Sequence, residues 1–156
     1  MLRDPNEDVQ STAVVLLLKN GNPVPKSDLL PLLNHSHPDT VAFVANLLRG
    51  GGRIRYVGDS TESLPPVSSA DVAPLMTNRF GNARLIGLRA MQDMGDATAV
   101  ELTLPLLRDT NSVIRSLAFY TLQTITGKDV SEDDPAKWEQ WWAANKATFT
   151  PRQSQR

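Results

Sequence analysis

Three copies of one short phrase constrain this chain more than any other feature of its sequence. They are Leu30-Pro31-Leu32-Leu33, Ala73-Pro74-Leu75-Met76 and Leu104-Pro105-Leu106-Leu107. A second pattern begins nine residues after each proline, and one more copy of it lies nearer the N-terminus; the four heads are Val9, Thr40, Ala83 and Ile114. The heads lie 31, 43 and 31 residues apart. A two-part repeat with a period near thirty is typical of stacked helix pairs rather than of a domain closed around one pocket.

The second pattern of each repeat predicts a helix with one buried face. Small or apolar residues follow the head at positions four and eight, as in Ala83, Gly87 and Met91, and this spacing places them on one helical face. A small residue at the fourth position lets a neighbouring helix approach closely. Glycine ends the pattern at Gly21, Gly52, Gly95 and Gly127, where a left-handed residue can close a helix.

The register of the second unit has two solutions, one with Thr40 and Val44 and one with Val41 and Ala45 on the buried face. The orientation of this helix therefore stays open at the level of the sequence.

The first pattern predicts a shorter helix that contains the proline. Asp28 and Asp71 lie three residues before Pro31 and Pro74, so we expect each aspartate to be an N-cap and each proline to lie in the first turn. Leu102 takes the matching place before Pro105. This predicts a longer helix in the last unit, starting near Ala97 and kinked at the proline.

These units resemble the HEAT repeat. The resemblance is carried by Leu106-Leu107-Arg108-Asp109, Ile114-Arg115, Ala118, Leu122 and Gly127, and nearly as well by Ala83-Arg84, Gly87, Ala90-Met91 and Met94-Gly95. It covers roughly residues 2–127. The resemblance implies an all-α fold, an α-solenoid of stacked antiparallel helix pairs whose second helices line the concave side. It implies no chemistry, because members of the family mostly bind other macromolecules.

The expected organisation is a single repeat domain, residues 1–149, with one loop insertion. Its units lie near residues 1–21, 27–52, 70–95 and 97–127, followed by a capping helix at 134–149 and a flexible tail at 150–156.

The C-terminal segment resembles the tails that close many bacterial HEAT-repeat proteins. Asp134 is a suitable N-cap and Pro135 a suitable first helical residue. Trp138, Trp141 and Trp142 share one helical face. We expect them to cover the open apolar end of the stack, with an aromatic binding patch as the alternative.

Composition limits the function classes. Sixteen basic and seventeen acidic residues give a net charge of −1, so no global field attracts nucleic acid or an acidic membrane. The chain has no cysteine, which excludes thiolate metal sites and cysteine nucleophiles. His35 and His37, with Asp39 nearby, suit a turn better than a metal site. We expect no catalytic residues, no cofactor, no metal, no nucleic-acid partner and no membrane insertion.

The N-terminus matches the middle of a unit, because Leu2-Arg3-Asp4 corresponds to Leu107-Arg108-Asp109. We therefore expect the helix at 9–18 to lack its mate and to expose apolar residues. This predicts a piece of a longer solenoid, a docking surface for a partner, or a homodimer. A cytoplasmic location follows if Met1 is the true start, and a periplasmic or secreted one if the chain is part of a longer precursor.

Two surfaces are candidates for binding a protein partner. The insert at 51–66 carries a possible short strand or hairpin with Arg53, Arg55 and Tyr56, although a merely tolerated loop is as good an account. The second helices carry a set of side chains that we call the polar ladder, namely Asn46, Arg49, Arg89, Gln92, Tyr120 and Gln123.

The sequence thus predicts a non-enzymatic protein-interaction or scaffold module. The alternative is a HEAT-like enzyme or nucleic-acid binder, resembling the HEAT-like DNA glycosylases or bilin lyases. A glycosylase would use Arg49, Arg84, Arg89 and Arg115 as a basic groove, but the ladder carries no acidic residue for its chemistry.

Overall fold

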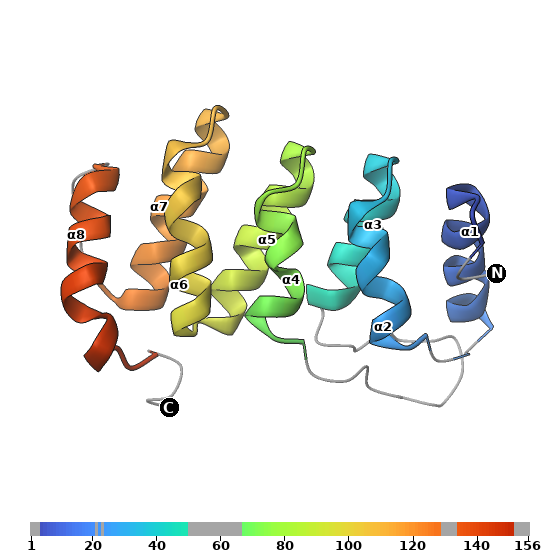
Figure 1. Ribbon diagram of the computed structural model, residues 1–156, viewed down its shortest axis with the longest axis horizontal. Helices are drawn as coiled ribbons and strands as arrows, with labels where there is room; N and C mark the ends of the chain where they lie inside the picture. The colour runs from blue at the N-terminus through green and yellow to red at the C-terminus, as the bar shows by residue number, and fades with distance from the viewer. Residues whose placement is uncertain (1–3, 21, 23, 50–66, 129–133, 152–156) are drawn as a thin grey trace.

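The computed structural model describes residues 4–20, 22, 24–49, 67–128 and 134–151, and this part of the chain is all-helical. The α-helices stand side by side in a row with α1 (Glu7–Lys19) at one end and α8 (Pro135–Asn145) at the other (Figure 1). The predicted all-α class is therefore confirmed for the described residues.

Between these ends the helices form two layers. The first layer contains α2 (Lys26–Leu29) with the 3-10 helix η1 (Leu30–Asn34), then α4 (Ser69–Met76), then α6 (Ala97–Thr103) with η2 (Leu104–Arg108). The second layer contains α3 (Pro38–Arg49), α5 (Gly81–Met94) and α7 (Ser112–Thr126). Within each layer successive elements are in contact, and α4 also packs on α5 and η2 on α7. A short 3-10 helix, η3 (Lys146–Thr148), follows α8.

The three prolines of the first layer do not all have the same effect on the helix that contains them. At Leu30-Pro31 and Leu104-Pro105 the α-helix gives way to a 3-10 helix, with proline in its first positions. Because proline lacks the N–H and its ring clashes with the preceding turn, a change of helix type is a common outcome. The predicted start at Ala97 is confirmed, whereas the predicted long kinked helix is instead an α-helix that ends at Thr103 and a 3-10 helix that contains Pro105.

The predicted N-caps of the first layer are wrong. Asp28 lies inside α2, whose N-cap position is Pro25. In α4 the N-cap is Ser68, and Asp71 is the third helical residue of a capping box in which each side chain bonds the other's backbone N–H. Pro74 consequently lies inside α4 and not in its first turn. The missed signal is the pair Ser68 and Asp71, three residues apart.

Helix ends in the second layer follow the glycine prediction where they are described. Gly95 and Gly127 have φ of 66° and 67°, and each donates its N–H back into the preceding helix. In α3 the head of the buried stripe is Val41, which is fully buried with Val44, Ala45 and Leu48, whereas Thr40 is only partly buried. The buried stripe therefore takes residues from both solutions, because Val44 and Leu48 follow Thr40 at positions four and eight, whereas Val41 and Ala45 are the alternative pair.

One apolar core runs along the row from Val14 in α1 to Trp142 in α8. At the α8 end, Asp134 accepts the N–H of Ala136 and Pro135 starts the helix, as predicted. Trp138 and Trp142 are 1% and 5% exposed, and α8 packs against η2. The tryptophans thus pack into the end of the core, as expected of a cap.

Several predicted features lie outside the described residues: the hairpin in the 51–66 insert, the helix stops at Gly21 and Gly52, the segment Leu2-Arg3 and most of the 150–156 tail. Among the helices that the structure describes, none combines the length and apolarity needed to cross a membrane.

Candidate functional site

The polar ladder lies on the second layer, with two members on each of α3, α5 and α7. Asn46, Arg89 and Tyr120 occupy the same position of the repeat and are all exposed, Tyr120 to 57%. Since α3 contacts α5 and α5 contacts α7, these side chains occupy neighbouring helices of one face. The structure therefore brings the ladder together, as the repeat spacing predicts.

Part of the ladder is engaged within the protein. Arg49 Nε donates to Asp93 Oδ2 at 2.8 Å, with the two side chains 36% and 54% exposed. An exposed pair of this kind contributes little stability. Gln92 donates to the hydroxyl of Thr124 at 3.2 Å, and Asn46 donates to the carbonyl of Ala42 in its own helix. These bonds orient the side chains without burying them.

Arg89 differs from Arg49 because no carboxylate in the described part of the chain forms an ion pair with it. The nearby acid on the same helix, Asp93, is already paired with Arg49. The centre of the ladder is therefore an exposed guanidinium, with five N–H donors suited to a carboxylate.

Large apolar side chains are exposed on α1 and on the second layer, and the sequence predicted apolar exposure for α1. The exposed large apolar side chains of the described part are Leu16 (48%), Phe43 (38%), Val113 (61%) and Tyr120 (57%). They belong to α1, α3 and α7, whereas the described residues of the first layer and α8 contribute none. Of the four, Leu16 lies in the helix expected to expose apolar residues and Tyr120 belongs to the polar ladder, whereas Phe43 and Val113 were not predicted. The signal that could have found Phe43 is its place three residues before Asn46, on the same helical face.

Arg84 and Arg115 are two of the four arginines considered for a basic groove, and the structure gives them another role. Arg84 bonds both carboxylate oxygens of Asp109, at 2.8 and 3.2 Å, and its guanidinium also donates to the carbonyl of Asn78. Arg115 donates to the carbonyls of Asp109 and Thr110. Both side chains tie down the turns between paired helices, and they do not form an open groove.

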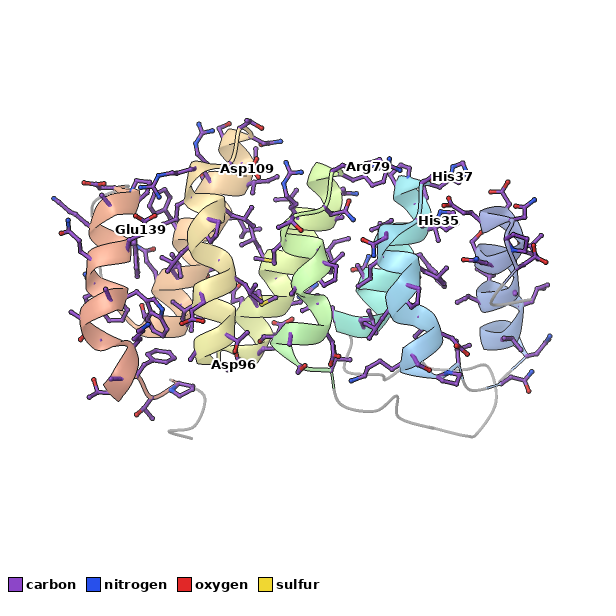
Figure 2. All side chains as sticks on the ribbon, in the orientation of Figure 1. His35, His37, Arg79, Asp96, Asp109 and Glu139 are labelled. Atoms are coloured by element: carbon purple, nitrogen blue, oxygen red, sulfur yellow. The ribbon has the colours of Figure 1, made fainter. Side chains whose placement is uncertain are left out.

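Asp109 is the carboxylate on which this turn is built. Burial raises the pKa of Asp109, but the backbone N–H of Asn111 and the guanidinium of Arg84 outweigh burial and hold the pKa below its usual value. Its side chain is only 6% exposed. Asp109 lies on the same edge of the row as His35, His37 and Arg79 (Figure 2).

The two histidines join α1 to the first turn. His35 is 4% exposed; its Nδ1 accepts the backbone N–H of His37, so we assign the proton to Nε2, which donates to the carbonyl of Glu7 at 2.9 Å. The hydroxyl and backbone N–H of Ser36 bond the Glu7 carboxylate and lower its pKa. His37 lies beside Asp8, with Nε2 and Oδ1 3.4 Å apart. These contacts are those of a structured turn.

The tryptophan face is a packed aromatic cluster. Trp138 and Trp141 meet edge to face with centroids 5.9 Å apart, and Phe149 packs on Trp142 at 5.2 Å. The ammonium of Lys128 lies 5.0 Å from the Trp141 ring, and desolvation lowers its pKa. Burial of Trp138 and Trp142 leaves little of this cluster open as a binding patch.

For metal chemistry, no group of three or more histidine and acidic side chains gathers in the described part of the chain. Arg53, Arg55 and Tyr56, the predicted contacts of the insert, lie outside the described residues.

No protein-family model matches this sequence, and comparisons with curated proteins and with solved structures also give no match.

Proposed function

We propose that this chain is a non-enzymatic protein-binding module, built as a HEAT-like α-solenoid, that holds a partner on the exposed face of its second layer. The observation that carries the proposal is the one-sided distribution of exposed apolar side chains. Phe43, Val113 and Tyr120 belong to the second-layer helices α3 and α7, and Leu16 belongs to α1, which lines a groove with α3. Exposed apolar groups gathered on one face are characteristic of interaction sites.

The solenoid architecture is supported by the repeated order of elements. Each unit places a proline-containing first helix before a longer second helix, and successive units contact through like helices. Such arrays present an extended surface that suits macromolecules better than small substrates.

Arg89 and Tyr120 are the side chains we expect to contribute most to partner binding. Both are exposed and lie at the same repeat position on adjacent helices, and arginine and tyrosine are enriched among energetically dominant contacts. Asn46, Arg49, Gln92 and Gln123 would surround them as adaptable polar contacts.

The rival nucleic-acid function has weaker support. Arg84 and Arg115 are occupied by turn carbonyls and Asp109, and Arg49 is paired with Asp93. Arg89 alone among the four arginines is left to meet phosphates, whereas affinity for nucleic acid grows with the number of phosphates neutralised.

The test is affinity capture from native lysate with quantitative mass spectrometry, followed by titration of the captured protein. We compare the wild type with Arg89→Glu/Tyr120→Ala and with the control Thr98→Glu, an exposed position on α6 in the first layer. We expect the double variant to bind its partner at least tenfold more weakly, as loss of an anchor residue predicts, and the control to bind normally.

Equal capture by all three proteins would overturn the proposed face. A duplex DNA probe at low salt serves as a further arm, and tight, salt-sensitive binding there would favour the nucleic-acid function instead.

A further inference from the structure

A groove separates α1 from α3 at the end of the row. Its volume is about 450 Å3, and its walls include Val15 and Leu16 from α1 and Phe43 from α3. Leu16 and Phe43 are 48% and 38% exposed even though they line a hollow. Side chains of this size left open to water lose contact area that an inserted apolar group would restore.

The charged side chain among the described residues that line the groove is acidic. Asp39 lines it, with Ser11, Thr12 and Thr40, and the described residues of its lining include no lysine or arginine. In the described part of the chain Asp39 forms no ion pair. Glu7 and Asp8 lie in the first turn of α1, where Glu7 is bonded by Ser36 and Asp8 lies beside His37. The apolar hollow therefore has one acidic side chain, Asp39, among its described lining residues.

We propose that this groove binds a short amphipathic segment of a partner protein, with one large apolar side chain inserted between α1 and α3 and an adjacent lysine or arginine facing Asp39. The occupant follows from charge complementarity, because an acidic or neutral segment would leave Asp39 without a cation. A volume of about 450 Å3 is at the small end of the range for binding pockets, so it fits an anchor residue rather than a whole domain.

This site contains Leu16 and Phe43 of the proposed face and therefore rests on the proposed function, but it shares no residue with the polar ladder, so variants of the groove and of the ladder distinguish a failure of one from a failure of the other. The probe is a random 12-residue peptide library displayed on phage and selected against the full chain, with counter-selection on the Leu16→Ser/Phe43→Ser variant. We expect enriched peptides to place leucine, phenylalanine or tryptophan next to lysine or arginine.

Fluorescence polarisation of a labelled enriched peptide then measures affinity. We expect at least a tenfold loss with Leu16→Ser/Phe43→Ser, and a roughly threefold loss with Asp39→Asn together with a weaker salt dependence, since an exposed ion pair is screened by salt. The control Thr98→Glu should bind as the wild type does, and Arg89→Glu serves to distinguish the groove from the ladder. Circular dichroism of each variant establishes that the helices are intact.

Three outcomes overturn the proposal: no peptide is enriched, the enriched peptides are acidic, or they bind the groove variants as well as the wild type. A loss of peptide binding in Arg89→Glu alone would move the site to the ladder and leave the groove without a role.

Discussion

Gly87 marks a close approach between α5 and α4. A Cβ built at Gly87 in α5 would lie 2.9 Å from both Leu75 Cβ and Met76 Sδ of α4. The small residue at the fourth position of the repeat, noted from the sequence, is thus required by packing between paired helices.

We expect Gly87→Ala to destabilise the protein by about 1–2 kcal/mol, because overpacking of a tight contact outweighs the helix propensity gained from alanine. Urea unfolding followed by circular dichroism measures this change. Gly81→Ala is the matched control on the same helix, since its Cβ would make only ordinary contacts at 3.6–4.0 Å. Gly81→Ala should be neutral or slightly stabilising, and equal stabilities for the two variants would contradict the packing argument.

Asp71 couples stability to pH. Hydrogen bonds from Lys26 and from the backbone of Ser68 lower the pKa of Asp71 from 3.8 to about 2, and Lys26 Nζ lies 2.8 Å from Oδ2. Because the folded pKa lies below the ordinary value, this stabilisation is complete above pH 3.8 and is lost as the pH falls through about 2.

We therefore expect Asp71→Asn to cost about 1–2 kcal/mol at neutral pH, as loss of a capping interaction and an ion pair. The cost should shrink between pH 4 and pH 2. Lys26→Met retains the bonds between Ser68 and Asp71 and should cost less. A stability difference for Asp71→Asn that stays constant across this pH range would contradict the assignment.

Among the helices, α8 stabilises the end of the core through apolar packing rather than charge. Trp138 is 1% exposed, whereas the ion pair between Arg108 and Glu139 is 52% and 46% exposed. We expect Trp138→Ala to lower the free energy of unfolding by about 3–5 kcal/mol. Glu139→Gln on the same helix should change it by less than about 1 kcal/mol. Thermal unfolding ranks the two variants, and similar losses would contradict the claim that packing contributes more than the ion pair.

The first-layer elements show why local signals misplace the caps. Distance from a proline predicts Asp28 and Asp71 as N-caps. The backbone instead starts α4 one turn earlier, at Ser68, because the serine and Asp71 satisfy each other's N–H groups. In α2 the helix begins after Pro25 with no side-chain cap. Both helices start five residues before their proline, at Lys26 and at Ser69, but α4 has a side-chain cap and α2 has none.

Local stability should differ between α1, at one end of the row, and the helices in the middle of the row. The buried residues described in α1 are Ala13 and Val14, whereas α5 buries Ala83, Ile86, Leu88, Ala90 and Met91 besides Gly87. We expect the amides of α1 to exchange with deuterium at least ten times faster than those in the middle of α5 and α7, because local opening costs least where few apolar groups are buried. Hydrogen exchange with mass spectrometry measures this, and uniform protection from α1 to α7 would contradict it.

The ladder could be predicted because a repeat fixes equivalent positions in advance. Asn46, Arg89 and Tyr120 are found on one face from their spacing alone. What the spacing could not predict is which arginine is free: Arg84, Arg89 and Arg115 look alike in sequence, yet Arg84 and Arg115 bond turn carbonyls and Asp109. Those partners lie on other segments, so only the packed turns decide them.

Local sequence patterns are enough to specify the all-helical class, the alternation of short and long helices, the glycine ends at Gly95 and Gly127, and the Asp134-Pro135 start of α8. Each depends on residues within a few positions of one another, where backbone geometry and side-chain periodicity act locally. Packing between helices sets the buried register of α3, the partners of the arginines, and the groove between α1 and α3. These depend on the distance between helices, which is set by how side chains from separate units fill the space between them.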